Sequence, residues 1–218
     1  MAASDPDLEE WRERLAERVA DQPGDDGSHD VHHCQRVWRL CQRIADGEGV
    51  AVDRLVLLAA AYLHDVVNPP KDSPERNRAS RLSAQRAAEW LAVMGFPEAK
   101  LDGVRHAIEA HSFSAGIAPE TVEARILQDA DRMEALGAIG LARVFYVAGR
   151  LRSRLFDPAD PLSARRAPDD RRFAVDHFKL KLLRLPASMR TRTGRRLAAE
   201  RAAFLERYLE QLARELAV

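Results

Sequence analysis

A histidine and an aspartate stand side by side at the end of the most apolar stretch of the chain. His64 and Asp65 directly follow residues 55–63, nine nearly unbroken apolar positions that predict a core helix. A carboxylate carried into a core needs a cation, hydrogen-bond donors or a metal ion to offset the loss of water. Groups that could complete such a site are His33 upstream and a pair of aspartates downstream.

The sequence around the pair also bears on its role. A histidine–carboxylate pair that merely closes a helix end is the structural alternative. However, Pro69 and Pro70 end the helix within about a turn, and polar residues follow at once. This placement predicts that the pair lies at the mouth of the helix, where water and phosphate can reach it.

His33 is predicted to point inward from its own helix. It shares a helical stripe with Val37, Cys41 and Ile44, whereas His32 shares a stripe with arginines. An inward histidine can also be an ordinary hydrogen-bonded core residue, and the segment alone leaves both interpretations open.

Two aspartates, Asp129 and Asp131, lie within the otherwise largely apolar segment 126–135. Helical phase slightly favours Asp129 as the inward residue, because it shares a side with Ile126 and Met133. Two imidazoles and two carboxylates from three helices make a donor set suited to a divalent transition metal ion. Such an ion polarises a phosphoryl oxygen and lowers the pKa of bound water.

Helical periodicity extends over nearly the whole chain and no convincing β alternation occurs. The sequence therefore predicts an all-α fold of eight or nine helices, in a single domain over residues 1–218. The second helix is expected to begin at Ser28 or Asp30, which can act as N-caps, and to run to about residue 45. The other helices are predicted near residues 5–20, 53–66, 80–94, 98–112, 119–135, 137–149, 170–185 and 191–216.

Composition limits the classes of partner. Lys plus Arg and Asp plus Glu both number 34, so the formal net charge is zero and no nucleic-acid partner is expected. No apolar run reaches the roughly 18–20 residues of a membrane span, and the acidic N-terminus lacks the layout of a signal peptide. We therefore expect a cytoplasmic protein with no membrane association. The apolar stripe of the last helix could serve the core or a homodimer.

The order His33, His64-Asp65, Asp131 resembles the H…HD…D signature of the HD-domain superfamily of metal-dependent phosphohydrolases. The likeness is to the small stand-alone bacterial members, some of which are nucleotide pyrophosphohydrolases. It covers residues 25–150, with 151–218 as a C-terminal helical extension. Matching Ala130-Asp131-Arg132 to the last element of the signature selects Asp131 over Asp129.

The resemblance implies an HD-type helical bundle and a single bound metal ion. His33, His64, Asp65 and Asp131 would be its ligands, and Mn²⁺, Fe²⁺, Ni²⁺ or Zn²⁺ its identity, with Mg²⁺ as a further candidate. A second metal would require two more histidines, and the candidates are His106 and His111. Their i, i+5 spacing separates them by about 140° around a helix, which disfavours a shared site.

The expected reaction is hydrolysis of a phosphate ester or anhydride in a small phosphorylated substrate, a nucleotide. Both a nucleoside triphosphate pyrophosphohydrolase and a phosphomonoesterase fit. Asp72 or Glu75 would orient the attacking water as general base. The residues expected to bind substrate are Asn68, Lys71, Arg76, His106, His111 and Arg132. The structural alternatives to these binding roles are a solvated charged turn over residues 71–78 and, for His106 and His111, an ordinary position on the protein surface.

Two other functions stay open on sequence grounds. A di-iron oxygenase could use the same helical frame, with His106 and His111 as additional ligands. A non-catalytic HD protein could bind a nucleotide without turning it over, although the intact signature argues against a degenerate site.

Overall fold

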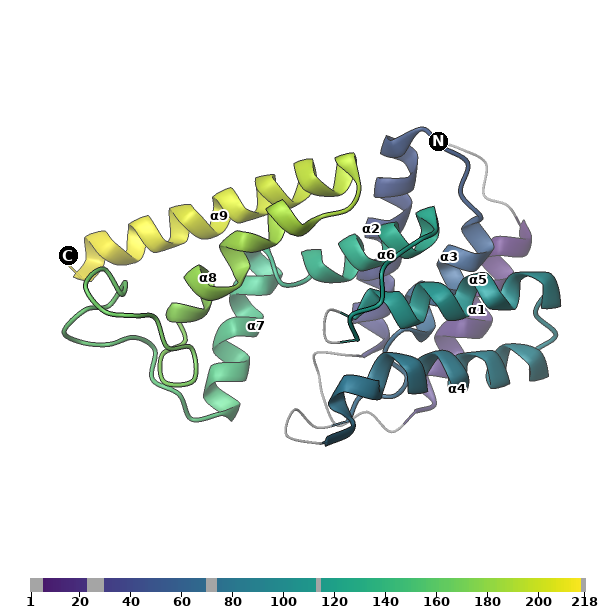
Figure 1. Cartoon of the computed structure of the whole chain (residues 1–218), viewed down its shortest axis with the longest axis horizontal. Helices are drawn as coiled ribbons and strands as arrows, with labels where there is room; N and C mark the ends of the chain where they lie inside the picture. Colours follow the sequence, from purple (N-terminus) through teal and green to yellow (C-terminus); the bar gives the residue numbers. More distant parts are fainter. Residues whose placement is uncertain (1–5, 23–29, 70–73, 113–114, 217–218) are drawn as a thin grey trace. The chain divides into compact units, whose positions relative to one another are not determined.

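A computed structural model of the chain describes residues 6–22, 30–69, 74–112 and 115–216. These residues form nine α-helices and two short 3-10 helices, and no β-strand occurs among them, so the predicted all-α class is confirmed. The elements, labelled in part in Figure 1, are α1 (Pro6–Ala20), α2 (Val31–Glu48), α3 (Arg54–Leu63), η1 (Pro74–Arg78), α4 (Ala79–Val93), α5 (Glu98–His111), α6 (Val122–Met133), α7 (Gly137–Arg150), α8 (Asp176–Leu180), η2 (Leu182–Ser188) and α9 (Arg192–Leu216).

The chain forms two compact units, Met1–Asp131 and Arg132–Val218. The predicted single domain with a C-terminal extension from residue 151 stays a prediction. No helix in the described ranges combines the length and apolar character needed to cross a bilayer.

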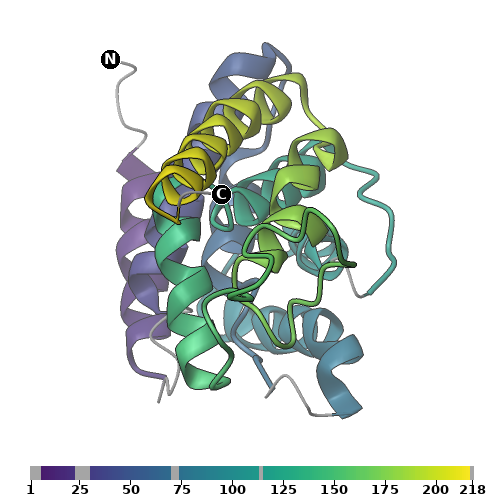
Figure 2. The same cartoon turned by 90° about the vertical axis from the view of Figure 1, so that its left-hand side faces the viewer.

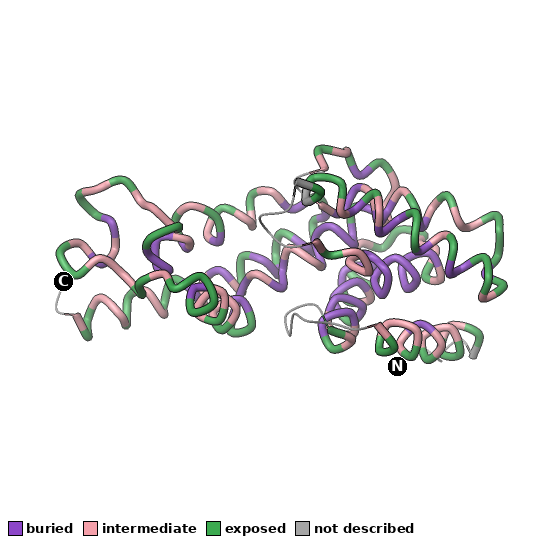
Figure 3. Tube along the Cα trace, turned by 90° about the horizontal axis from the view of Figure 1, so that it is seen from below, coloured by how far each residue is buried: buried purple, intermediate pink, exposed green. Residues whose placement is uncertain are grey.

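Helix α3 is the centre of the first unit. Every residue from Val56 to Leu63 is buried, because α3 packs against α1, α2 and α5 together. A helix covered on all sides has no polar stripe, which explains the unbroken apolar run in the sequence. Asp53 caps its start by accepting hydrogen bonds from the backbone N–H groups of Leu55 and Val56. Buried residues, purple in Figure 3, line the inner sides of the helices.

Helix α2 begins as its sequence predicts and ends at Glu48, three residues beyond the predicted end. The Asp30 side chain accepts a hydrogen bond from the His33 backbone N–H at 2.9 Å, and Gly49 ends the helix with a left-handed φ of 68°. Ser28, the other predicted cap, lies outside the described residues. His33 is fully buried and His32 is exposed, so the predicted orientation of the helix is confirmed.

One predicted helix is interrupted. In place of a continuous helix over 170–185, the structure has α8 followed by η2. Lys181 departs from helical geometry, with φ −131° and ψ −60°, and Pro186 lacks the N–H that a longer helix would need.

The glycines after α6 make the turn into α7. Gly137 has a left-handed φ of 68°, and a methyl group at Gly140 would overlap the carbonyl oxygen of Ala135. Arg201 of α9 donates to the Met133 carbonyl oxygen at 2.7 Å, which satisfies an acceptor at the end of α6. Both features belong to the second unit.

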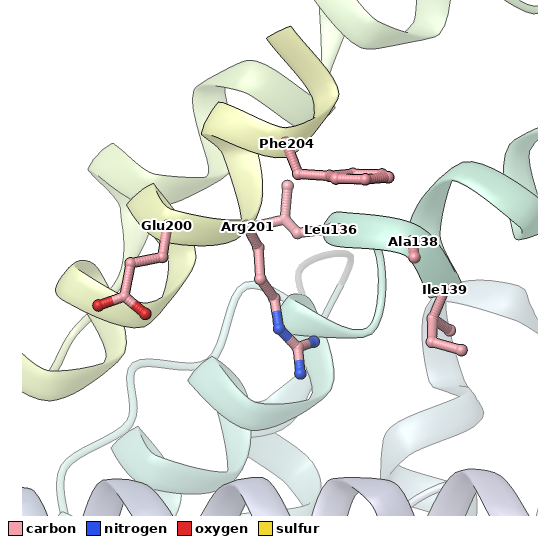
Figure 4. A pocket seen from close by; sticks show the side chains of 7 residues that line it. Leu136, Ala138, Ile139, Glu200, Arg201 and Phe204 are labelled. Carbon is pink, nitrogen blue, oxygen red and sulfur yellow. The ribbon is translucent and has the colours of Figure 1, made fainter. Parts of the chain in front are cut away.

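Helix α9 buries part of its apolar stripe within the second unit, including Leu197 and Leu205. The Tyr208 ring lies 5.8 Å from that of Phe178 and 6.0 Å from that of Phe145. A hollow of about 350 Å³ lies between α9 and the start of α7, lined by Leu136, Gly137, Ala138, Ile139, Glu200, Arg201 and Phe204. Figure 4 shows the side chains around it. None of these is a predicted site residue. The homodimer stays a prediction.

Candidate metal centre

Three helices of the first unit bring a cluster of nitrogen and oxygen donors together. His33 lies in the first turn of α2, His64 is the C-cap of α3, and Asp131 lies in the last turn of α6. The Nε2 atoms of His33 and His64 are 3.3 Å apart. Asp131 Oδ1 lies 3.6 Å from His33 Nε2 and 3.7 Å from His64 Nε2. These three residues could hold a metal ion, since one donor atom from each lies within 4.8 Å of the others.

A second group of donors shares His64 with the first. His64 Nε2 lies 3.5 Å from Asp65 Oδ2, and His111 Nε2 lies 3.4 Å from Asp65 Oδ1. The rings of His64 and His111 meet edge to face, with centroids 4.9 Å apart. The structure thus brings His33, His64, Asp65 and Asp131 together as the sequence predicts, and adds His111.

His111 was expected in the substrate pocket, and sequence reasoning missed its place beside the donor cluster. A signal was available, because His111 is the last residue of α5 just as His64 directly follows α3. Both helices stop at a histidine that faces the same point.

Backbone carbonyl groups orient these two histidines. His64 Nδ1 lies 3.0 Å from the Ala61 carbonyl oxygen, and His111 Nδ1 lies 2.6 Å from that of Ile108. A carbonyl oxygen only accepts, so Nδ1 carries the hydrogen in both rings. Each Nε2 is thereby directed into the cluster, as in histidines that bind metal ions.

The cluster is closed on its imidazole side and open on its carboxylate side. His33 and His64 are fully buried, whereas the side chains of Asp65 and Asp131 are 22% and 27% exposed. Burial alone would lower the pKa of His64, but the charges of Asp65 and Asp131 outweigh it and raise that pKa to about 9. Burial likewise opposes ionisation of Asp131, yet the interaction with His64 holds its pKa below the ordinary value. A cation is therefore favoured at this point.

The donor chemistry fits a divalent transition metal ion. Only imidazole nitrogens and carboxylate oxygens make up the two groups found among the described residues. Burial raises the pKa of the Cys34 thiol to about 12 and that of Cys41 well above its ordinary value. A thiol binds metal as the thiolate, so neither cysteine suits the role of a ligand.

The geometry also separates the two aspartates of α6. Asp129 is fully buried but belongs to neither donor group, whereas Asp131 contacts both buried histidines. Helical phase could not make this distinction, because α6 is buried over a wide arc that includes Asp129. The position of Asp131 agrees with the alignment to the HD signature.

Other predicted residues lie elsewhere. His106 accepts a hydrogen bond at Nε2 from the Glu120 backbone N–H at 3.0 Å and belongs to neither donor group. Arg132 donates to the Ser188 carbonyl oxygen at 3.2 Å within the second unit. Asn68 and Glu75 are exposed. Lys71 and Asp72 lie outside the described residues, as does the side chain of Arg76, whose backbone belongs to η1.

Comparison with known proteins identifies the family. The HD domain matches residues 30–136 of this chain. Over 192 residues the chain is 33% identical to the uncharacterized protein YpgQ of Bacillus subtilis, with 86% of this chain and 84% of that protein covered. The chain belongs to the HD-domain family. The H…HD…D resemblance is thereby confirmed.

Solved structures of HD-domain proteins share the fold. A crystal structure of B. subtilis YpgQ in complex with ADP has 31% identity and a TM-score of 0.71, over 94% of this HD-domain chain and 97% of the other. An HD-superfamily hydrolase from Bacillus thuringiensis has 28% identity and a TM-score of 0.73, over 97% and 99% of the two chains. This HD-domain protein therefore has the fold of the HD-superfamily hydrolases.

The two histidines of α5 are expected to behave differently when replaced. His111→Ala should weaken binding of a divalent ion about 10–100-fold, because it removes a group that contacts the donors Asp65 and His64. His106→Ala should leave ion affinity within about twofold and cost about 1 kcal/mol of stability, through the lost Glu120 hydrogen bond. Calorimetric titration and thermal unfolding measure the two effects. Equal loss of ion binding in both variants would instead support a second metal held by both histidines.

Proposed function

We propose that this HD-domain protein is a metal-dependent phosphohydrolase that cleaves a phosphate ester or anhydride of a nucleotide. The observation that carries the proposal is the donor cluster around His64. It combines the buried imidazoles of His33 and His64 with the half-buried carboxylates of Asp65 and Asp131. A nucleoside triphosphate pyrophosphohydrolase and a phosphomonoesterase are the two forms of the activity we propose. The ADP complex of YpgQ supports a nucleotide as the ligand.

The residues of the cluster have separate roles in this proposal. His33, His64 and Asp131 hold one divalent ion, with Asp65 as the fourth ligand. Such an ion polarises a phosphoryl oxygen and lowers the pKa of bound water. Mn²⁺, Fe²⁺, Ni²⁺ and Zn²⁺ all suit the nitrogen and oxygen donors. His111 positions Asp65 through the contact between its Nε2 and Asp65 Oδ1.

Residues around the cluster complete the proposed site. The exposed position of Glu75 is compatible with a general base that orients water, and Asp72 is the other candidate. Lys71 and Arg76 would neutralise phosphate oxygens, because phosphoryl transfer depends on charge stabilisation more than on covalent help. These roles are inferred from the charge of the side chains and from their position in the segment that follows His64-Asp65.

The position of His106 favours hydrolysis over the oxygenase alternative. A di-iron site would need both histidines of α5, yet His106 accepts a backbone hydrogen bond and belongs to neither donor group. Metal counting distinguishes the two functions, because an oxygenase would carry two irons per chain and consume oxygen.

A panel of nucleotides and phosphate esters tests the proposal. Release of phosphate and pyrophosphate would be measured separately with Mn²⁺, Mg²⁺, Ni²⁺ and Fe²⁺, for the wild type and for His64→Ala and Asp65→Ala. We expect turnover of at least one nucleotide and its loss in both variants. Turnover that neither substitution changes would refute the assignment. Nucleotide binding without turnover under any of these ions would favour the non-catalytic alternative.

A further inference from the structure

The second unit contains a hollow of about 300 Å³ whose lining is almost entirely cationic. Four arginines and one serine surround it, all from the loop that joins α7 to α8. In Figure 2 the loop is drawn as a green trace. The lining residues, which we call the arginine hollow, are Arg152, Ser153, Arg154, Arg171 and Arg172.

Backbone pairing holds the two arms of the arginine hollow together. Arg154 and Phe173 form an isolated parallel β-bridge. The Arg154 N–H donates to the Arg172 carbonyl oxygen at 2.9 Å. The Ala174 N–H donates to the Arg154 carbonyl oxygen, also at 2.9 Å. Phe173 is only 3% exposed and anchors the bridge in the unit. Arg154 and Arg172 therefore extend from paired backbone segments.

The carboxylates of the same loop have other partners. Arg166 forms ion pairs with Asp157 at 3.2 Å and with Asp176 at 2.5 Å. Asp160 accepts from the backbone N–H groups of residues 164–166, Asp170 pairs with His177, and Asp169 accepts from the Arg171 backbone N–H. Within the described part of the chain, no ion pair reaches the side chains of the four hollow arginines.

This arrangement attracts anions. All four arginines are exposed, and an anion that lies among them is attracted by several like charges at once. Arg152 also has a left-handed φ of 55°, which is uncommon for a residue with a Cβ and is typical of functional positions. The Arg172 guanidinium also lies 5.1 Å from the centre of the buried Phe173 ring, within the range of a cation–π contact.

We propose that the arginine hollow is a binding site for a small polyphosphate anion, such as pyrophosphate or the triphosphate group of a free nucleotide. Guanidinium forks bind phosphate oxygens in pairs, and four of them match a ligand with several phosphate oxygens. The volume suits a small molecule and lies at the lower end of ligand pockets. The arginine hollow shares no residue with the donor cluster, and its existence does not depend on the proposed hydrolysis.

Titration of the full-length, metal-loaded chain with methylenediphosphonate, a pyrophosphate analogue that resists hydrolysis, tests the site. We expect Arg154→Gln/Arg172→Gln to weaken one class of binding site at least tenfold and to leave nucleotide turnover unchanged. Arg43→Gln/Arg86→Gln is the matched control, because it removes equal charge from exposed positions on α2 and α4. The control should bind the analogue as the wild type does.

Three outcomes would overturn the site. Unchanged binding by Arg154→Gln/Arg172→Gln would show that the hollow takes no phosphate. Equal weakening in the control pair would show diffuse electrostatics. Tighter binding of a single-stranded oligonucleotide than of free triphosphate, lost in the same variant, would assign the surface to nucleic acid. Partial binding by Arg154→Lys/Arg172→Lys would support recognition by the guanidinium fork beyond charge alone.

Discussion

Replacing Asp131 by asparagine is expected to weaken divalent-ion binding by more than about 100-fold and to reduce phosphate release to background. The carboxylate contacts the Nε2 atoms of both His33 and His64, so its loss removes a charged donor from the centre of the cluster. Loss of an outer partner of a metal ligand alone costs about 10–100-fold in affinity, and loss of a ligand should cost more. Metal content after gel filtration and initial rates of hydrolysis measure the two effects.

Asp129→Asn is the matched control for this experiment. Asp129 lies two residues earlier in the same helix and is more deeply buried, but it belongs to neither donor group. We expect the asparagine variant to retain its metal ion, with any cost appearing as a lower melting temperature. Circular dichroism would verify folding of both variants. If Asp129→Asn loses the ion and Asp131→Asn keeps it, the helical-phase argument is right and the proposed ligand set is wrong.

Ion binding is expected to depend steeply on pH. The carboxylates around His64 raise its pKa to about 9 in the absence of metal, so at neutral pH a proton occupies the nitrogen that the ion needs. The apparent affinity should therefore rise about tenfold per pH unit below about pH 9 and level off above it. Calorimetric titrations in buffers of different ionisation enthalpy would count the proton released per ion.

The stability of the metal-free chain should change with pH in the opposite direction. The pKa of His64 is higher in the folded state than its ordinary value of 6.5, so its contribution is fully present below about pH 6.5 and is lost as the pH rises through about 9. The lowered pKa of Asp131 contributes above its ordinary value of 3.8 and is lost in acid. Metal-induced stabilisation should meanwhile grow with pH. A constant difference in melting temperature between metal-loaded and stripped protein from about pH 6.5 to 9 would contradict this linkage.

The sequence was sufficient wherever a local pattern decides the structure. Asp30 could be identified as a cap and His33 as an inward residue, because capping and helical phase act within one or two turns. The apolar run of α3 predicted a central helix for the same reason. The approach of His33 and His64 could be inferred only from the chemical cost of a buried carboxylate, since 31 residues separate them.

Distant packing decided what the sequence could not. Asp129 and Asp131 are both compatible with a helix that is covered over a wide arc, and only the positions of α2 and α3 place Asp131 among the donors. The role of His111 beside Asp65 depends on where α5 ends relative to α3. The break at Lys181 was missed because a helical pattern continues through it.

The two histidines at the helix ends have a consequence for protein design. In each, the ring bonds a carbonyl three residues earlier, an acceptor that the end of a helix leaves without an N–H partner. One hydrogen bond thus closes the helix, selects the tautomer and aims the free nitrogen beyond the terminus. Two such termini set face to face bring two oriented imidazoles to one point, and the tautomer of each is set by its own backbone. A designer could graft this pair onto an idealised bundle by choosing only the stopping points of its helices.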